Sequence, residues 1–238
     1  MTFFLGALLW LTPAPPPSAL PQVERAVFTL TNNERARHGL PALQLDETLD
    51  AIARQHSVDM LRRNFFSHTN PDGENPGDRI GKAHRQLIGE GAENVWSGSG
   101  YSVAASAAQI VGDFMNSPGH RANILNQEYT HLGVGVAMDG KEIRATQNFA
   151  VAVAYLIKPT PHSVLRGATL DLRVNPVAGA APTQFDLWSD RSGQRVFGPA
   201  RLVDAPILAP PGSYRLRFYF PKGNGKFSVR MGPAIEVR

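Results

Sequence analysis

The sequence predicts a mixed α/β domain followed by a small all-β domain, and three observations carry this prediction. Apolar residues recur at helical spacing in the first part of the chain, and the pattern changes to a period of two over residues 132–153. A proline-containing stretch, residues 158–162, follows this second pattern. Beyond that stretch only strand-like patterns occur. With 238 residues, the chain is long enough for one good core and a smaller second one.

The first residues are expected to be a targeting segment. An apolar run from Phe3 to Leu11 is followed at once by four closely spaced prolines. This run is less than half of the roughly 20 apolar residues needed to span a bilayer. We therefore predict a signal peptide over residues 1–19, with Ala19 as the candidate cleavage position, and a secreted or cell-envelope protein without a transmembrane anchor. A buried N-terminal helix is the alternative interpretation. The chain has no cysteine, which excludes disulfides, thiolate metal ligands and a thiol nucleophile.

Three amphipathic helices are expected in the first domain. The first lies within residues 21–39, where apolar positions share one face. Asp46 can cap the second helix, because its carboxylate can accept hydrogen bonds from the first backbone N–H groups, and residues 49–60 supply the apolar face. The third helix is expected over residues 103–115 and ends before Pro118.

An antiparallel hairpin is expected after these helices. Residues 132–138 alternate bulky side chains with Gly133, Gly135 and Ala137, so one face of this strand is almost bare and lets a helix lie close. Asp139-Gly140 is a two-residue hairpin signal, and residues 143–153 form the returning strand. The pattern favours helices packed around a small sheet.

Charge divides the mature chain into two parts at the predicted linker, residues 158–162. Residues 20–157 carry 12 basic and 15 acidic side chains, a net of −3, whereas residues 158–238 carry 12 basic and 5 acidic side chains, a net of +7. We therefore expect a first domain over residues 20–157 and a basic β-sandwich-like domain over residues 158–238. The basic domain is a candidate for contact with anionic wall polymers or lipid head groups, although scattered arginines on solvated strand faces also explain its charge. The overall charge of +4 does not indicate nucleic acid as a partner.

Polar residues in three separate segments are the candidates for chemistry. His68 follows the second helix, Glu93 and Asn94 are expected in a glycine-rich loop, and His120 precedes a short predicted helix. Two imidazoles and a carboxylate are the ingredients of a divalent metal site with an open position. The helix dipole would keep His120 neutral and able to ligate. Hydrogen-bonded loop histidines are the alternative, and His56 on the apolar face of the second helix is expected to be a core histidine.

The stretch from residue 30 to residue 153 resembles the CAP superfamily, also called the SCP or cysteine-rich secretory, antigen 5 and pathogenesis-related-1 proteins. The resembling segments are NERARHGLPAL from Asn33, FSHTNPDG from Phe66, AENV from Ala92, NSPGHRANIL from Asn116, YTHLGVGV from Tyr129 and TQNF from Thr146. They cover a little over half of the chain in the family's order, and the absence of cysteine is most similar to its bacterial, disulfide-free branch.

The resemblance implies an α-β-α sandwich with a central cleft that contains two histidines and two acids. His68 and His120 match the histidines and Glu93 matches the first acid, but Ser117 occupies the position of the second acid. A serine hydroxyl is neutral and a poor metal ligand, so the four-member site is incomplete. A divalent metal, zinc first, held by His68 and His120 remains the expectation, in a weakened form. The other residues expected to line the cleft are Asn94, Ser117 and Gln147.

Two functions follow as expectations. The first is a secreted binding protein whose cleft or surface engages a lipid, a cell-wall component or a small molecule, as the resemblance implies. The alternative is a metal-dependent hydrolase of extracellular or cell-wall substrates, in which a metal on His68 and His120 activates water and Glu93 is the candidate catalytic base. Because the sequence contains no sign of substrate orientation, binding is favoured over hydrolysis.

Overall fold

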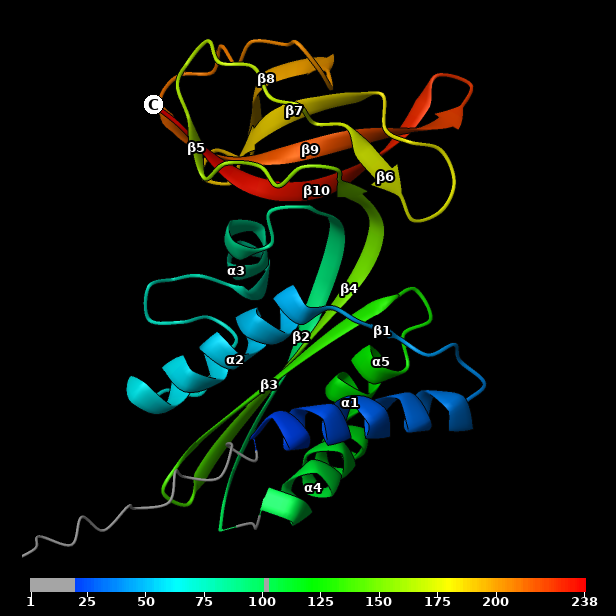
Figure 1. Cartoon of the computed structure of the whole chain (residues 1–238), viewed down its shortest axis with the longest axis vertical. Helices are drawn as coiled ribbons and strands as arrows, with labels where there is room; N and C mark the ends of the chain where they lie inside the picture. The colour runs from blue at the N-terminus through cyan, green and yellow to red at the C-terminus, as the bar shows by residue number, and fades with distance from the viewer. Residues whose placement is uncertain (1–19, 101–102) are drawn as a thin grey trace, which may run out of the picture.

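A computed structural model describes residues 20–100 and 103–238; the predicted signal peptide, residues 1–19, lies outside this part. The helices are α1 (Leu20–Arg37), α2 (Glu47–Arg62), α3 (Pro76–Ala83), α4 (Val103–Asn116) and α5 (Pro118–Ile124). The strands are β1 (Gln44–Leu45), β2 (Leu87–Ser99), β3 (His131–Asp139), β4 (Glu142–Leu156), β5 (Ser163–Val164), β6 (Val174–Pro176), β7 (Gln184–Ser189), β8 (Gln194–Arg201), β9 (Gly212–Gly223) and β10 (Lys226–Val237). Figure 1 shows helices around β2, β3 and β4 in the lower part and strands in the upper part.

The lower part is a three-layer sandwich. Its sheet has the strand order β1-β3-β4-β2, with β6 added beside β4. Helix α2 covers one face, and α1, α4 and α5 cover the other (Figure 1). The α-β-α architecture is therefore confirmed, as are the helices that begin after Asp46 and at Val103 and the Asp139-Gly140 hairpin.

Strand β3 lies unusually close to α2 because two of its residues have no side chain. A Cβ atom on Gly133 would lie 2.2 Å from the carbonyl carbon of Leu49, and one on Gly135 would lie 1.8 Å from the backbone nitrogen of Arg54. The opposite face of β3 presents Val134 and other apolar side chains to the core beneath α1 and α4. The alternation of bare and bulky residues thus fixes which helix lies on which face.

Two helices on the same side of the sheet have side-chain caps. Asp46 Oδ1 accepts hydrogen bonds from the backbone N–H groups of Thr48 at 2.9 Å and Leu49 at 3.0 Å, as predicted. Helix α3, which was not predicted from the sequence, begins with a reciprocal capping box between Asn75 and Asp78. This box matters for the site, because it fixes the first turn of the helix that carries Arg79.

The upper part is a second sheet with the order β5-β10-β9-β7-β8, which confirms the all-strand pattern of the C-terminal region. Its core is shared with the lower part, since Ile88 of β2 and Leu156 of β4 pack in one cluster with Phe185 and Leu216. The segment predicted as a linker is docked, not free: Thr160 N donates to Arg85 O at 3.0 Å, and Arg85 donates to the Thr160 hydroxyl at 2.8 Å. Among the described helices, none is long and apolar enough to cross a membrane.

Candidate functional site

The structure brings His68 and Glu93 into direct contact and places His120 nearby. His68 lies in the loop after α2, and its Nδ1 is 2.9 Å from Glu93 Oε1. His120 lies in α5, where its carbonyl accepts a hydrogen bond from the Asn94 amide at 3.1 Å. Burial lowers the pKa of His120, and the proximity of the His68 ring lowers it further, so both causes favour the neutral imidazole. The predicted neutrality is therefore supported, but burial is its main cause rather than the helix dipole.

The sequence predicted Glu93 and Asn94 in a loop, but they lie in the middle of β2, the strand at the edge of the sheet. Successive residues of a strand point to opposite faces, so their side chains serve different layers. Glu93 faces α2 and α3, whereas Asn94 faces α5. The glycines on either side, which suggested a loop, instead belong to a strand that lies close to its neighbours: a Cβ on Gly91 would come 2.3 Å from Phe149 O.

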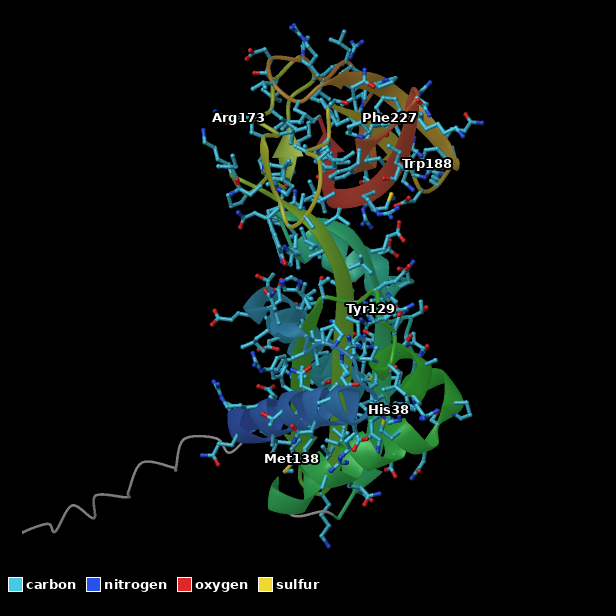
Figure 2. The ribbon with its side chains drawn as sticks, turned by 90° about the vertical axis from the view of Figure 1, so that its right-hand side faces the viewer. His38, Tyr129, Met138, Arg173, Trp188 and Phe227 are labelled. Carbon is cyan, nitrogen blue, oxygen red and sulfur yellow. The ribbon has the colours of Figure 1, made fainter. Side chains whose placement is uncertain are left out.

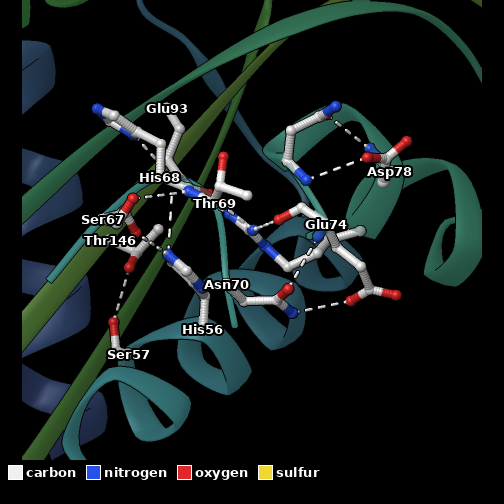
Figure 3. A network of polar contacts seen from close by, with 12 residues as sticks. His56, Ser57, Ser67, His68, Thr69, Asn70, Glu74, Asp78, Glu93 and Thr146 are labelled. Atoms are coloured by element: carbon white, nitrogen blue, oxygen red, sulfur yellow. Dashed lines mark hydrogen bonds and ion pairs between the residues drawn. The ribbon is translucent and has the colours of Figure 1, made fainter. Parts of the chain in front are cut away.

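The carboxylate of Glu93 is buried and all of its neighbours are donors. Its side chain is 1% exposed, and the Arg79 guanidinium donates to Oε2 at 2.6 Å. The Asn148 amide, in the orientation that satisfies both of its ends, donates to the same oxygen at 3.2 Å. His56 Nε2 lies 3.8 Å from Oε1. Figure 3 shows His56, His68 and Glu93 close to one another, with Ser67, Thr69 and Asn70 of the loop that follows α2. Burial removes the hydration of the Glu93 carboxylate, and the Arg79 guanidinium and the hydrogen bonds replace it.

These contacts fix the tautomers of two histidines. Because a carboxylate only accepts, His68 Nδ1 carries the proton that it donates to Glu93; in the neutral ring Nε2 is then an acceptor, and the ring is half exposed. His56 Nε2 is 3.0 Å from Ser67 O, and a carbonyl also only accepts, so this nitrogen carries the proton as well. His56 thus holds the residue before His68 in place. It is a buried histidine, as predicted, but one that belongs to the site.

Arg79 and Asn148 were missed by the sequence analysis. Arg79 donates to the carbonyls of His68 at 2.9 Å and Glu74 at 2.8 Å, besides its ion pair with Glu93. One guanidinium therefore orders the loop and neutralises the carboxylate together. The available signal was an arginine directly after the helix-start sequence Asn75-Pro-Gly-Asp78, with no acidic partner one turn away on its own helix.

The other three residues expected to line the cleft have different positions. Asn94 and Gln147 are both fully buried, and the Asn94 amide donates to Gln147 Oε1 at 3.1 Å. Gln147 also donates to the Thr31 hydroxyl of α1 at 2.8 Å. These two side chains therefore connect the sheet to α1 and α5. Ser117 is the residue that precedes α5, and its hydroxyl makes no capping hydrogen bond. Helix α4 does carry an acid, Asp113, but this carboxylate accepts from the Trp96 indole at 2.8 Å.

The donor set does not fit the expected metal centre. In the described part of the chain, no group of three or more histidine, aspartate or glutamate side chains is placed to hold a metal ion. The chemical reason is that Glu93 already has a guanidinium 2.6 Å from one oxygen, and a cation at that distance competes with any metal. Ser117 supplies no negative charge in its place. His68 Nε2 and the His120 ring remain as groups that can accept or donate hydrogen bonds.

Comparison with known proteins assigns the lower part of the molecule. The model of the cysteine-rich secretory protein (CAP) family matches residues 28–153. The uncharacterized protein YkwD of Bacillus subtilis (strain 168) is 40% identical over 124 residues, which cover 52% of this chain and 46% of YkwD. The uncharacterized membrane protein YlbC of the same organism is 39% identical over 126 residues, covering 53% of this chain and 34% of YlbC. The chain thus spans less than half the length of these curated relatives.

Solved structures also match this part. An extracellular protein with an SCP domain from Bacillus anthracis str. Ames is 34% identical with a TM-score of 0.48, over 58% of this chain and 44% of that one. An outer surface protein from Borrelia burgdorferi is 19% identical with a TM-score of 0.47, over 55% of this chain and 93% of that one.

Proposed function

The chain belongs to the cysteine-rich secretory protein (CAP) family, and from this premise we propose that it is an extracellular binding protein which takes a small polar ligand beside the Glu93 network. The observation that carries the proposal is a cavity of about 560 Å³ between α2, the loop after it and α3. His56 and Arg79, which hold Glu93 and the His68 loop, also line this cavity. Its volume lies within the roughly 300–1,000 Å³ of typical small-molecule sites.

The lining of the cavity indicates the chemistry of the ligand. Arg63 pairs with Asp72, and Lys82 pairs with Glu74, so both signs of charge line the walls together with Asn70. Walls with paired charges favour a ligand that carries donors and acceptors but little net charge. A cell-wall fragment made of sugar and peptide has this character, whereas an acyl chain would remove the paired charges from water and offer them no hydrogen bonds.

The same geometry argues against the hydrolase. A general base needs a free lone pair within reach of water, but Glu93 is 1% exposed and its oxygens accept from His68 and Arg79. The metal that would activate water lacks its acidic ligand. We therefore assign Glu93 a positioning role, in which it holds His68 with Nε2 directed away from the carboxylate.

An acyl chain is the second candidate ligand, because one observation favours it. A groove of about 570 Å³ lies between α1 and α4, and its lining is mainly Pro21, Ala26, Leu30, Ala107 and Ala108 with a few polar side chains. This groove is on the other face of the sheet from the Glu93 network, so the two candidates have separate sites and can be tested separately.

Two matched variants distinguish these sites. Ala83 lines the polar cavity at the end of α3, and Ala108 lines the apolar groove on α4; both are exposed helical alanines that leucine can replace. We would titrate the full chain with a soluble disaccharide-peptide from peptidoglycan and with laurate, using isothermal calorimetry. We expect the disaccharide-peptide to bind wild type and Ala108→Leu alike and to lose affinity for Ala83→Leu, and we expect mass spectrometry to recover it uncleaved.

Other results would change the assignment. Binding of laurate that Ala108→Leu abolishes would move the function to the groove. Failure of both probes, or cleavage of the disaccharide-peptide in a Glu93-dependent manner, would refute the proposal.

A further inference from the structure

One face of the C-terminal sheet lies against α3 and β2 at one end, and its remaining part has no covering layer in the described chain. Its other face packs Phe185, Leu187, Leu216 and Phe218 into the shared core. Because side chains alternate along a strand, Asp186 and Trp188 of β7 and Arg217 and Tyr219 of β9 point to the opposite face. At one end of this second face Arg215 and Met231 lie against α3 and β2, whereas Asp186, Trp188, Arg217 and Tyr219 contact one another.

The strand register gathers aromatic rings and guanidinium groups on this face. Asp186 is paired with Arg217, and Gln184 with Tyr219, across β7 and β9. The Arg217 guanidinium lies 3.8 Å from the centre of the Trp188 ring, and the Phe227 ring of β10 lies 6.1 Å from that of Tyr219. Phe227 is 44% exposed, and Figure 2 shows it with Trp188 on the upper sheet. We call this set the aromatic face: Trp188, Arg195, Arg201, Arg217, Tyr219 and Phe227.

The net charge of the aromatic face is positive: Arg217 pairs with Asp186, Asp190 lies nearby in the turn after β7, and Arg195 and Arg201 carry the remaining charge. Two carboxylates have strand positions on this side of the sheet: Asp186 is fully buried under Arg217, and Glu236 lies at the far end of β10 beside Arg238. Arg195 is opposite Trp188 and Arg201 is opposite Gln184, so both belong to this face, and both are exposed. Residues 205–235 contain five basic and no acidic side chains.

These features together indicate one kind of partner. Exposed aromatic rings on a sheet can lie against flat, partly apolar rings, and arginine pairs with a carboxylate or phosphate through two parallel hydrogen bonds. A membrane is less well matched, because the aromatic face is spread over several strands instead of projecting from a loop or an amphipathic helix. A single-stranded nucleic acid has similar chemistry, but the chain belongs to a family of extracellular type, where anionic polysaccharides are the available polymer.

We propose that the aromatic face is a docking surface for an anionic polysaccharide, with Trp188, Tyr219 and Phe227 against sugar rings and Arg195 and Arg201 on the acidic groups. This surface is separate from the cavity beside Glu93, so it attaches the protein to a polymer independently of what the cavity binds. It also gives the basic C-terminal part a function that net charge alone does not specify.

The test uses the full chain and a fluorescently labelled polygalacturonate at low salt, with binding followed by fluorescence anisotropy. We expect Arg195→Gln with Arg201→Gln to raise the dissociation constant at least about tenfold, and Phe227→Ala roughly fivefold. The control is Arg37→Gln with Arg166→Gln, which removes the same charge elsewhere on the surface and should change the constant less than about twofold. Added salt should weaken the wild type more than the Arg195/Arg201 variant.

Several outcomes would overturn the proposal. These are equal loss of affinity in the double variant and its charge-matched control, unchanged affinity of Phe227→Ala, or equal binding of uncharged dextran. Tighter binding of single-stranded DNA or of phosphatidylglycerol vesicles than of polygalacturonate would replace the polysaccharide by that partner. The circular dichroism spectrum of each variant is compared with that of wild type. Because Phe227 is exposed, we expect its replacement to leave the spectrum unchanged.

Discussion

Replacement of Arg79 by methionine tests whether the buried ion pair with Glu93 holds the site together. Methionine keeps much of the length and apolar volume of the side chain but removes the charge. Glu93 is 1% exposed and Arg79 is 10% exposed, so the carboxylate would be left buried with only the His68 and Asn148 hydrogen bonds. Removal of one partner of a buried pair costs about 3–5 kcal/mol. We expect the lower end, about 3 kcal/mol, because those two donors remain.

The assay is urea unfolding followed by far-ultraviolet circular dichroism, with thermal unfolding alongside. A loss of about 3 kcal/mol corresponds to a melting temperature lower by roughly 6–12 °C for a chain of this size. The control is Lys82→Met on the same helix, whose pair with Glu74 is 62% exposed on the lysine side and should contribute less than about 1 kcal/mol.

A double variant decides whether the effect comes from the pair. Arg79→Met with Glu93→Gln removes both charges, so it should be less destabilised than the sum of the two single variants by at least about 1.5 kcal/mol. Additive losses, or an Arg79→Met variant as stable as Lys82→Met, would refute the claim that Arg79 serves to neutralise Glu93.

Three further predictions follow from other parts of the structure. Burial lowers the pKa of His56, so below about pH 6.5 the unfolded chain binds a proton at this residue that the folded chain does not bind. The contribution of His56 to the free energy of unfolding is therefore full above about pH 6.5 and decreases below it. In urea midpoints measured at several pH values, His56→Gln should weaken this dependence. Zinc should not raise the melting temperature in a manner that His68→Ala and His120→Ala abolish, since the donor set lacks an acid; a histidine-dependent rise would restore the metal expectation. Gly135→Ala should lower the free energy of unfolding by more than about 3 kcal/mol in calorimetry, because its Cβ would meet the α2 backbone. The Cβ of Gly112→Ala would meet nothing within 4 Å, so this variant should be neutral or stabilised by up to about 1 kcal/mol. Similar effects of the two substitutions would contradict the packing argument.

The sequence predicted those features that depend on local spacing. Asp46 before an apolar helical face, the alternation around Gly133 and the Asp139-Gly140 turn each specify backbone geometry over a few residues, and all three are present in the structure. Glu93 was assigned to a loop because glycines are frequent in loops. In β2, Gly89 and Gly91 instead lie where a side chain would meet the backbone of β4, and that requirement comes from residues distant in sequence.

Two residues of the site, His68 and Glu93, were predicted from the sequence, but the balance of charge around them was not. His68 and Glu93 meet, as expected, but the residue that determines what Glu93 can do is Arg79, which lies on a short helix without a hydrophobic period long enough to predict. Whether a carboxylate is a base, a metal ligand or a structural anion depends on its partners, and those are set by tertiary contacts. The spacing of His68, Glu93 and His120 in sequence contains no information on a third group that neutralises the acid.

The position of Arg79 depends in turn on the C-terminal sheet. Arg215 of β9 donates to Gly77 O at 2.9 Å, and its guanidinium occupies the space where a Cβ on Gly81 would lie, 2.5 Å from Cζ. Helix α3 is therefore held at its first turn by its own capping box and also by an arginine more than 130 residues away in sequence. A cut after residue 157 would remove this arginine and uncover Leu156, which packs in the shared core. The basic C-terminal part thus contributes to the geometry around Glu93 as well as to the surface of the molecule.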